Sequence, residues 1–474
     1  MLFAAVSSFR FSLSRQSGRS THNYLLLFPS SRRNFTPTTT RLAASRISIS
    51  DSFDGGNIQL DDIVQKSETN EFLVKLKIKP DVYTELEQKR HFQSFAFRST
   101  VSDLPLGETA HITYSIENAH ETSYAAAWQD STTCYTSTIH DTDSWKRQTN
   151  TQYKDGKLKW EHQHKRNGSV YFTYFPLYTY DQHLALVSKC AGFAQAKSLG
   201  QTIDGREMDC IVVGTGKRVA WIIHRQHPGE SMAEYFAEGL LTRLLGLDCN
   251  GQVDGLVRRL LQDYTFYIVP NMCPDGSVRG HLRTNAAGAN LNREWCESLN
   301  YPAPTLKNSP EVYHVLQAMK ESGVDLCLDV HGDEELPYNF LAGSEESQNW
   351  GPRLQALHGA FVAAYCRANP DMQAEFGYPP PTSPGGALPN IGTNAISNLF
   401  DCLSVTLEMP FKDCWSNSDP ERGWSPSRAR KLGASSLDAM AYIQGYLRDE
   451  GGDKLWEHLP ATDAYICPRD NYRD

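Results

Sequence analysis

The feature that most constrains the fold of this chain is the alternation of short apolar runs with helical patterns after Pro176. Runs typical of buried strands occupy residues 208–214, 218–224, 264–269, 325–330 and 403–407. Helical patterns separate them or follow them at residues 231–245, 309–323, 351–367 and about 427–447. Strands that alternate with helices in this way predict an α/β domain whose sheet is largely parallel.

The region before Pro176 has a different pattern, with short strands and no clear helix. Strand-like runs occupy residues 71–78, 91–97, 110–116 and 168–175, and Asp155-Gly156 marks a hairpin. Strands at this spacing favour a small antiparallel β-sandwich. The predicted organisation is a sandwich at residues 70–176 and an α/β domain at 177–450, with a linker at 47–69 and a tail at 451–474.

The first 46 residues differ in composition from the rest of the chain. They contain seven arginines and many serines and threonines, but no lysine, aspartate or glutamate. This composition is typical of a transit peptide, and it predicts a mitochondrial or plastid location. Without such a signal the expected location is the cytoplasm.

Charge, hydropathy and cysteine content exclude several classes of protein. The net charge of −9 argues against general binding to nucleic acid, and no apolar run is long enough for a membrane helix. Eleven cysteines without a CxxC pair indicate neither a zinc ribbon nor a thioredoxin site. The sequence gives no basis for an oligomeric state.

Two HxxE motifs stand out, at His227 to Glu230 and at His331 to Glu334. Such a motif alone is weak, because about one chance match is expected in a chain of this composition. Their placement adds weight, since both follow the end of an apolar strand, as does Glu408. The carboxyl ends of parallel strands meet at the edge of a sheet where sites are built.

Two histidines and one carboxylate form the usual open catalytic zinc site. Zinc lowers the pKa of a bound water, and a nearby carboxylate can accept the proton. Glu408 directly follows an apolar strand, and a buried carboxylate needs a partner or a task.

Together these residues resemble the zinc metallocarboxypeptidase family, and within it the cytosolic carboxypeptidase-like branch with its β-sandwich before the catalytic domain. The likeness covers about residues 70–450. The motifs that carry it, in the family's order, are His227 with Glu230, Pro274-Asp275-Gly276, Arg283, Asn292-Arg293, His331 and Glu408. The resemblance implies a mixed, mainly parallel sheet flanked by helices, one Zn²⁺ per chain and the C-terminus of a peptide or protein as substrate.

The resemblance also assigns roles. His227, Glu230 and His331 would hold zinc, and Glu408 would act as general base and then as proton donor to the leaving amine. Arg283 would stabilise the oxyanion. Asn292 and Arg293 would bind the terminal carboxylate of the substrate, for which the planar guanidinium is well suited.

The sequence departs from the family pattern at two positions. Cys273 stands where the family has the asparagine that opens the Pro-Asp-Gly turn, and Asn290 stands where many members have an aspartate beside the first zinc histidine. A neutral partner makes His227 a less electron-rich ligand. Our hypothesis is that Asp329 or Asp333 compensates.

Substrate preference is less constrained than the reaction. The cytosolic branch often removes glutamate from acidic tails, but the acidic character of this chain does not favour such tails. Lys412, just beyond Glu408, is interpreted as a solvated lysine, and the nearest tyrosine before Glu408 is Tyr378. A general or peptide-processing carboxypeptidase is therefore favoured over a deglutamylase. The alternatives are a zinc amidohydrolase acting on small acyl-amino acids and a non-catalytic binding module on the same fold.

Overall fold

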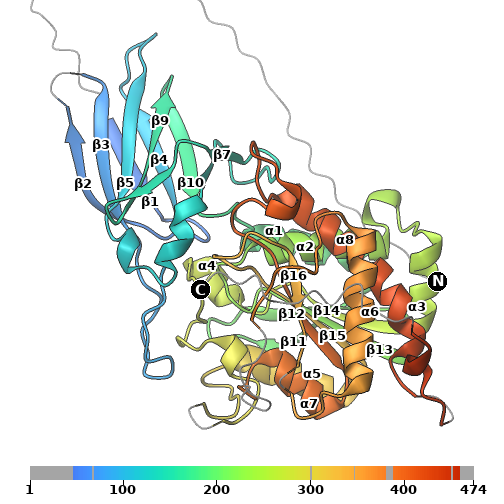
Figure 1. The fold of residues 1–474 in the computed structure, drawn as a ribbon. Coiled ribbons are helices and arrows are strands. Elements are labelled where there is room, and N and C mark those ends of the chain that lie inside the picture. Colours follow the sequence, from blue (N-terminus) through green and yellow to red (C-terminus); the bar gives the residue numbers. More distant parts are fainter. Residues whose placement is uncertain are drawn as a thin grey trace, which may run out of the picture. The chain divides into compact units, whose positions relative to one another are not determined.

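The computed structural model describes residues 46–66, 69–298, 301–345, 347–379, 388–449 and 452–459 (Figure 1). The predicted transit peptide at residues 1–46 lies outside these ranges except for Arg46, and it stays a prediction. Within the same ranges, no helix combines the length and the apolar character needed to cross a membrane.

Two five-stranded sheets form the sandwich. One has the order β1 (Arg46–Ser50), β4 (Ala96–Ser102), β10 (Gly168–Thr173), β6 (Thr133–Thr136) and β7 (Lys146–Gln148). The other has the order β2 (Gln59–Gln65), β3 (Glu71–Lys77), β5 (Ala110–Ile116), β9 (Lys157–His164) and β8 (Gln152–Lys154). Aromatic rings join the sheets: Tyr114 of β5 lies 4.7 Å from Phe172 of β10 between ring centroids.

The predicted sandwich differs from the structure in three respects. Residues 47–69 are not a linker, because β1 pairs with β4 and β2 pairs with β3. Both are edge strands, and the charged, mostly exposed residues of β2 hide its pairing from a pattern search. The strand predicted at 91–97 begins only at Ala96, and β3 and β5 run parallel in an otherwise antiparallel arrangement.

The second domain is built on a seven-stranded mixed sheet. Its order is β11 (Gln195–Gln201), β12 (Glu207–Val213), β14 (Tyr264–Val269), β13 (Arg218–His224), β15 (Leu326–Val330), β17 (Leu403–Glu408) and β16 (Phe340–Ala342). The four strands from β14 to β17 are mutually parallel, whereas β11, β12 and β16 are antiparallel to their neighbours. This is the mixed α/β arrangement that the sequence predicted.

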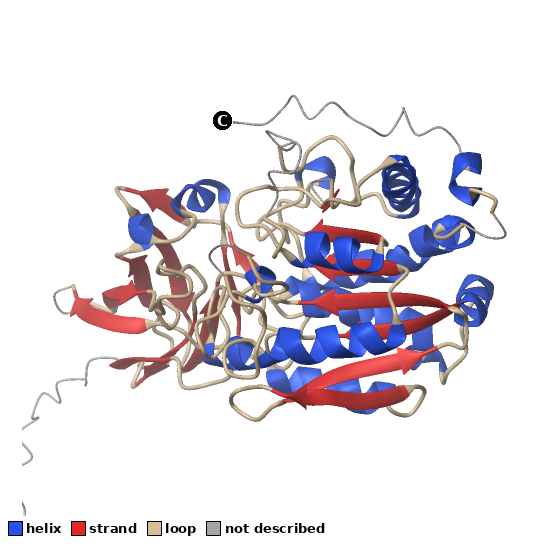
Figure 2. Ribbon diagram, turned by 90° about the horizontal axis from the view of Figure 1, so that it is seen from below, coloured by secondary structure: helices blue, strands red, loops and turns tan. Residues whose placement is uncertain are grey.

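Helices cover both faces of this sheet (Figure 2). The α-helices are α1 (Tyr180–Cys190), α2 (Met232–Leu245), α3 (Gly255–Asp263), α4 (Pro274–Arg279), α5 (Pro310–Ser322), α6 (Pro352–Ala368), α7 (Gly392–Phe400) and α8 (Pro426–Ile443). Short 3-10 helices occupy Ala119–Glu121, Ala125–Asp130, Leu247–Cys249, Leu291–Arg293, Trp415–Asn417, Gln444–Tyr446 and Leu455–His458. The sequence predicted α2, α5, α6 and α8, but not α1, α3, α4 or α7.

Helix ends show where local rules held and where tertiary contacts replaced them. Gly246 ends α2 in a left-handed conformation with φ +61°, and a Cβ there would lie 2.4 Å from the carbonyl oxygen of Gln252. Ser309 precedes Pro310 at the start of α5, a position where serine often caps a helix, but its hydroxyl makes no cap bond and instead donates to the Glu294 carboxylate over 3.0 Å. A buried acceptor outside the helix has taken the place of the expected cap.

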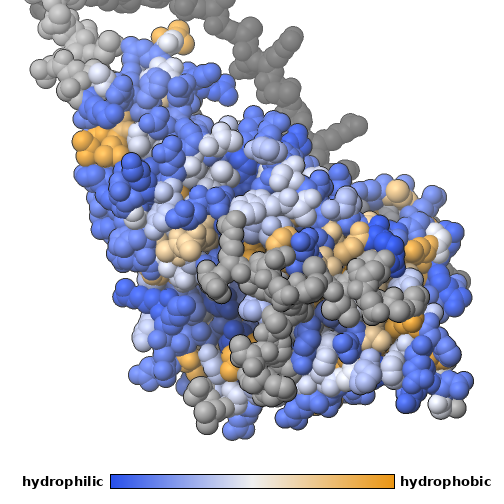
Figure 3. Space-filling model, viewed as in Figure 1, coloured by the Kyte–Doolittle hydropathy of each residue, from blue (hydrophilic) through white to orange (hydrophobic). Residues whose placement is uncertain are grey.

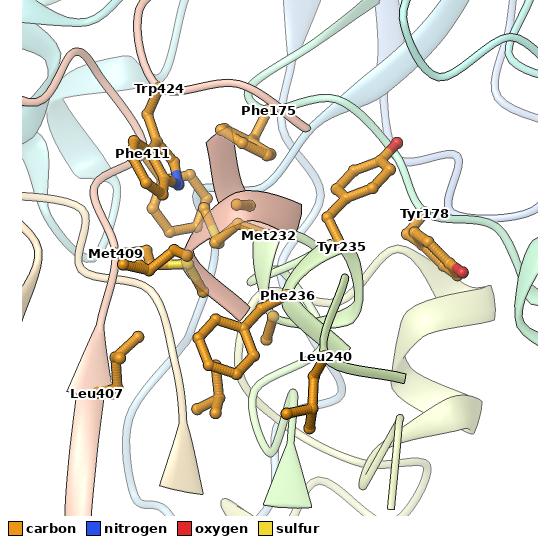
Figure 4. Packing of buried hydrophobic residues seen from close by; sticks show 14 of the residues in the cluster. Phe175, Tyr178, Met232, Tyr235, Phe236, Leu240, Leu407, Met409, Phe411 and Trp424 are labelled. Carbon is orange, nitrogen blue, oxygen red and sulfur yellow. The ribbon is translucent and has the colours of Figure 1, made fainter. Parts of the chain in front are cut away.

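Two hydrophobic cores lie against the two faces of the sheet, as the period-two alternation of a buried strand requires. In β13, Ala220 and Ile222 contribute to one core, whereas Trp221 and Ile223 contribute to the other. Figure 4 shows the first core, where side chains of α2 pack against the end of β17 and the segment after it. The same core is continuous with the sandwich, since Tyr174 stacks on Phe411 with centroids 4.6 Å apart.

In Figure 3 the visible face is largely hydrophilic, and its apolar residues form small separate groups. The exposed large apolar side chains include Leu60 and Val64 on the edge strand β2. Most of the described cysteines are buried, and each of them is unpaired.

Candidate active site

Three side chains that follow neighbouring strands converge at one edge of the sheet. His227 and Glu230 lie in the turn between β13 and α2, and His331 directly follows β15. Glu230 places one carboxylate oxygen 2.7 Å from His227 Nδ1 and the other 2.9 Å from His331 Nδ1. The two Nδ1 atoms lie 3.2 Å apart, and all three residues are buried. They form the one group of potential metal ligands within the described residues.

The outward-facing ring nitrogens show that this cluster fits a metal ion. His227 Nε2 lies 3.1 Å from Asn290 Oδ1, and His331 Nε2 lies 3.0 Å from a carboxylate oxygen of Asp329. An acceptor beside Nε2 favours the tautomer with its proton on that atom, which leaves the Nδ1 lone pairs directed at each other and at Glu230. Two lone pairs and a carboxylate in one buried space are the donor set of a zinc site.

The contacts of Asp329 and Asp333 revise the hypothesis that one of them compensates for the neutral Asn290. Asp329 lies beside His331 and not beside His227, and Gln226 donates to its other oxygen over 2.6 Å. Asp333 accepts a hydrogen bond from Tyr378 over 3.0 Å. His227 therefore keeps the neutral Asn290 as the partner of its Nε2 atom. The negative charge of Asp329 acts on His331 instead.

A buried network of charged residues fixes the turn that carries His227. Arg225, with φ +57°, donates to the carbonyl oxygens of Pro228 and Tyr178 over 2.9 Å each and to Glu234 over 2.5 Å. The other oxygen of Glu234 lies 2.8 Å from His183 Nδ1. A left-handed, non-glycine residue is retained only where its surroundings fix it, and here its own guanidinium does so.

His183 gives this network a pH dependence. Burial alone would lower the pKa of His183, but its contacts with Asp209 and Glu234 outweigh burial and raise the pKa to about 9. Because this exceeds the unfolded value, the stabilisation is complete below about pH 6.5 and is lost as the pH rises toward 9. The full span corresponds to about 3 kcal/mol. We expect His183→Gln to flatten the fall in urea midpoint between pH 6.5 and 9, whereas parallel curves for variant and wild type would contradict this.

Glu408 ends β17 and faces the same cavity. One of its oxygens accepts a hydrogen bond from Tyr378 over 2.8 Å, and the other is buried with no partner among the described residues. Burial raises the pKa of Glu408 well above its usual value, and Glu230 and Asp333 act in the same direction, against the charge of His331. A carboxylate with an unused oxygen and a raised pKa is suited to accept and return a proton.

Arg283, Asn292 and Arg293 line this cavity, which has a volume of about 410 Å³. A guanidinium nitrogen of Arg283 donates to the Tyr124 hydroxyl over 3.0 Å. The carbonyl oxygen of Asn292's side chain accepts from the Gly392 backbone over 2.8 Å, which leaves its amide group for other partners. Of the seven predicted site residues, six line the cavity, and His331 contacts two of those six.

Several residues of the cavity were not predicted. Tyr378 was the nearest tyrosine before Glu408, but spacing alone could not place it, whereas the structure puts its hydroxyl on Glu408. Tyr124 comes from the sandwich, and no signal in the sequence indicated it. The interpretation of Lys412 as solvated was wrong, because it is only 5% exposed. Glu334 of the second HxxE motif lines the cavity but lies outside the ligand cluster.

Comparisons with known proteins define the class. Residues 49–175 match the family model of the cytosolic carboxypeptidase N-terminal domain, and residues 179–373 match that of zinc carboxypeptidase. The chain belongs to the zinc carboxypeptidase family and is a zinc-dependent metallopeptidase. Its N-terminal domain is the one found in the cytosolic carboxypeptidase branch.

Individual relatives agree over nearly their whole length. A putative carboxypeptidase A from Shewanella denitrificans is 43% identical, with a TM-score of 0.74 over 84% of this chain and 99% of that one. A metallo-carboxypeptidase from Pseudomonas aeruginosa, solved with (2-guanidinoethylmercapto)succinic acid, is 35% identical, with a TM-score of 0.74 over 85% and 100%. An uncharacterised protein from Zymomonas mobilis is 37% identical over 86% of this chain and 99% of its own.

Proposed function

We propose that this chain removes single residues from the C-terminus of peptides, with His227, Glu230 and His331 holding one zinc ion. The observation that carries the proposal is the convergence, in one cavity, of this donor set, the unpaired oxygen of Glu408 and two arginines. When bound, zinc supplies Lewis acidity that lowers the pKa of water and polarises a carbonyl group.

The protein side chains account for the remaining steps. Asn292 and Arg293 hold the terminal carboxylate of the substrate, and Arg283 faces the scissile carbonyl, where it stabilises the developing negative charge. Glu408 takes one proton from the attacking water while the oxygen of that water bonds to the carbonyl carbon. It returns that proton to the amine nitrogen as the carbon–nitrogen bond breaks. Tyr378 donates to Glu408 and holds the carboxylate in place.

The test uses the full chain loaded with zinc and peptides that differ only in their last residue. Mass spectrometry should show loss of single C-terminal residues from the wild type and none from Glu408→Gln. An inactive wild type that still binds one zinc per chain would favour the amidohydrolase acting on small acyl-amino acids. Absence of both activity and zinc would favour a binding module.

The charges of the cavity indicate which terminal side chain it accepts. Among the described residues that line the cavity, the lysine and arginine side chains are those of Arg283 and Arg293. Both have proposed roles at the substrate backbone. The remaining carboxylic acid side chains outside the metal cluster and Glu408 are those of Asp333, Glu334, Glu335 and Glu345. Burial raises the pKa of Glu334 well above its usual value, so the negative charge rests mainly on the other three. This lining favours a basic or neutral terminal residue over glutamate.

We infer that Glu345, which lines the cavity, contacts that side chain. Ala342 pairs with Thr406 between β16 and β17, and Thr406 contacts Thr393. Glu345 follows closely, and a Cβ on Gly343 would lie 2.9 Å from its carboxylate. Glu345, Thr393 and Asn292 line the same cavity. The ligand solved with the Pseudomonas aeruginosa relative carries a guanidine group, which agrees with a basic side chain here.

Replacement of this carboxylate should change specificity. We expect Glu345→Gln to lower kcat/KM about tenfold for a peptide ending in arginine and to change it less than about twofold for one ending in leucine, because one charge-assisted contact is lost. Glu321→Gln on the exposed face of α5 is the matched control. Equal losses for both peptides, or a wild type that prefers a terminal glutamate, would contradict the assignment.

A further inference from the structure

The sandwich domain contacts the segment that carries Arg283 on several sides. This segment, residues 278–288, is called the arginine loop below. Gly55 donates its backbone N–H to Val278, and the Asn57 side chain donates to Gly280, over 3.0 and 3.1 Å. The Thr84 hydroxyl donates to Gly288 over 3.0 Å.

Asp81 makes the most extensive of these contacts. It lies after β3, is 4% exposed, and one of its oxygens accepts the backbone N–H of Leu282 over 2.7 Å. Its other oxygen accepts the backbone N–H groups of Arg283 and Thr284 over 2.8 and 2.9 Å, and the Thr284 hydroxyl over 3.2 Å. One buried carboxylate from the sandwich therefore fixes three consecutive residues of the catalytic domain.

The same domain also holds the tip of the Arg283 side chain. The Tyr124 hydroxyl accepts from the guanidinium over 3.0 Å and lines the cavity. Tyr124 is itself fixed, because its backbone N–H and carbonyl oxygen both bond to the Gln93 side chain, over 2.8 and 3.1 Å. Backbone and guanidinium of Arg283 are thus both held by residues of the sandwich.

The arginine loop is also joined to the zinc-binding turn. Gly229, between His227 and Glu230, donates its backbone N–H to the Leu282 carbonyl oxygen over 2.9 Å. A Cβ on Gly229 would lie 2.9 Å from that oxygen, so the approach requires glycine. The position set by Asp81 is therefore defined relative to the metal ligands.

We propose that the sandwich completes the active site, with Asp81 and Tyr124 as positioning residues that set Arg283 against the scissile carbonyl. This rests on the proposed function. Stabilisation of a developing oxyanion requires donors fixed before the reaction, so a loosened Arg283 loses its effect mainly in the transition state. The sandwich is on this basis a part of the catalytic apparatus and more than an aid to folding.

The test is Asp81→Asn in the full zinc-loaded chain. Asparagine offers one acceptor oxygen and turns an N–H₂ group toward the remaining N–H donors, so some of the hydrogen bonds of residue 81 to residues 282–284 are lost. This set of hydrogen bonds is called the Asp81 clamp below. We expect kcat to fall about 10- to 100-fold with KM changed less than about threefold and with zinc content unchanged. Asp62→Asn, on the exposed strand β2, is the matched control and should have no effect.

A double-mutant cycle separates positioning from general destabilisation. In an Arg283→Ala background, Asp81→Asn and Tyr124→Phe should lower kcat no further, because the residue that they position is gone. Losses that remain additive, or an Asp81→Asn variant with wild-type kcat, would overturn the proposal. A merely structural role would lower the unfolding midpoint and leave kcat of the folded protein unchanged.

One measurement does not depend on catalysis. Amide hydrogen exchange should show protected N–H groups at residues 282–284 in the wild type and at least tenfold faster exchange in Asp81→Asn. If the wild type removes no residue from any peptide, the proposed function fails, while this protection still tests the clamp. Unprotected amides in an active wild type would refute the clamp alone.

Discussion

Replacing Glu408 with glutamine should abolish most of the activity without removing the metal. Glutamine keeps the shape of the side chain and the acceptor for Tyr378, but it cannot take a proton from water. General acid–base catalysis typically contributes about 10²- to 10⁴-fold, and we expect kcat to fall within that range. Because Glu408 is outside the ligand cluster, zinc content should stay at one ion per chain.

Steady-state kinetics with a peptide ending in arginine would measure this effect, beside metal analysis of the same samples. Tyr378→Phe is an informative companion, because it removes only the hydrogen bond to one oxygen of Glu408 and should have a much smaller effect. A Glu408→Gln variant with more than a tenth of wild-type kcat would assign the base to another residue. Asp333 would then be the first candidate, since it also contacts Tyr378.

The sequence predicted most of the candidate site because its residues follow buried strands. His227 and His331 come after β13 and β15, and Glu408 ends β17; these three strands are neighbours in the sheet. Once a run is recognised as a buried parallel strand, the residue after it is placed at the carboxyl edge. The α/β order of the second domain followed from the same pattern, although the antiparallel strands β11 and β16 did not.

The residues that escaped prediction are those whose position depends on tertiary contacts. Asp81 binds residues about 200 positions away, and an isolated aspartate in a loop carries no pattern that indicates its partner. Lys412 shows the converse, since a lysine usually lies in water and only the packing shows that this one is buried. Almost all residues of the edge strand β2 are exposed, so its sequence shows no hydrophobic alternation.

The departures at Asn290 and Cys273 are resolved differently. Asn290 places its amide oxygen 3.1 Å from His227 Nε2, where an aspartate would place a carboxylate oxygen, so the contact is kept and only charge is lost. At Cys273 the backbone N–H donates to the Asn271 side chain over 2.8 Å, and α4 begins at Pro274 as the motif requires. The side chain of Asn271, two residues earlier in the chain, therefore supplies a hydrogen bond within the same turn.

Removal of a zinc ligand should have the other large effect, and here metal content is the primary measurement. His331→Gln deletes one of three donors and leaves Glu230 and Asp329 as buried carboxylates without the imidazole between them. Changes in the outer partners of a ligand alone alter metal affinity about 10- to 100-fold, so loss of the ligand should exceed 100-fold. Activity should fall in proportion to the zinc lost.

The experiment compares wild type, His331→Gln and His162→Gln after dialysis against a chelator and return of a measured amount of zinc. His162 lies on β9 of the sandwich and serves as the control for the chemical change itself. The wild type and His162→Gln should regain one ion and full activity, whereas His331→Gln should regain neither at the same free zinc concentration. Retention of one tightly bound ion by His331→Gln would place the metal elsewhere. Because Glu230 and His227 contact each other directly, a shared loss of zinc in variants of either residue would confirm that the three side chains act as one site.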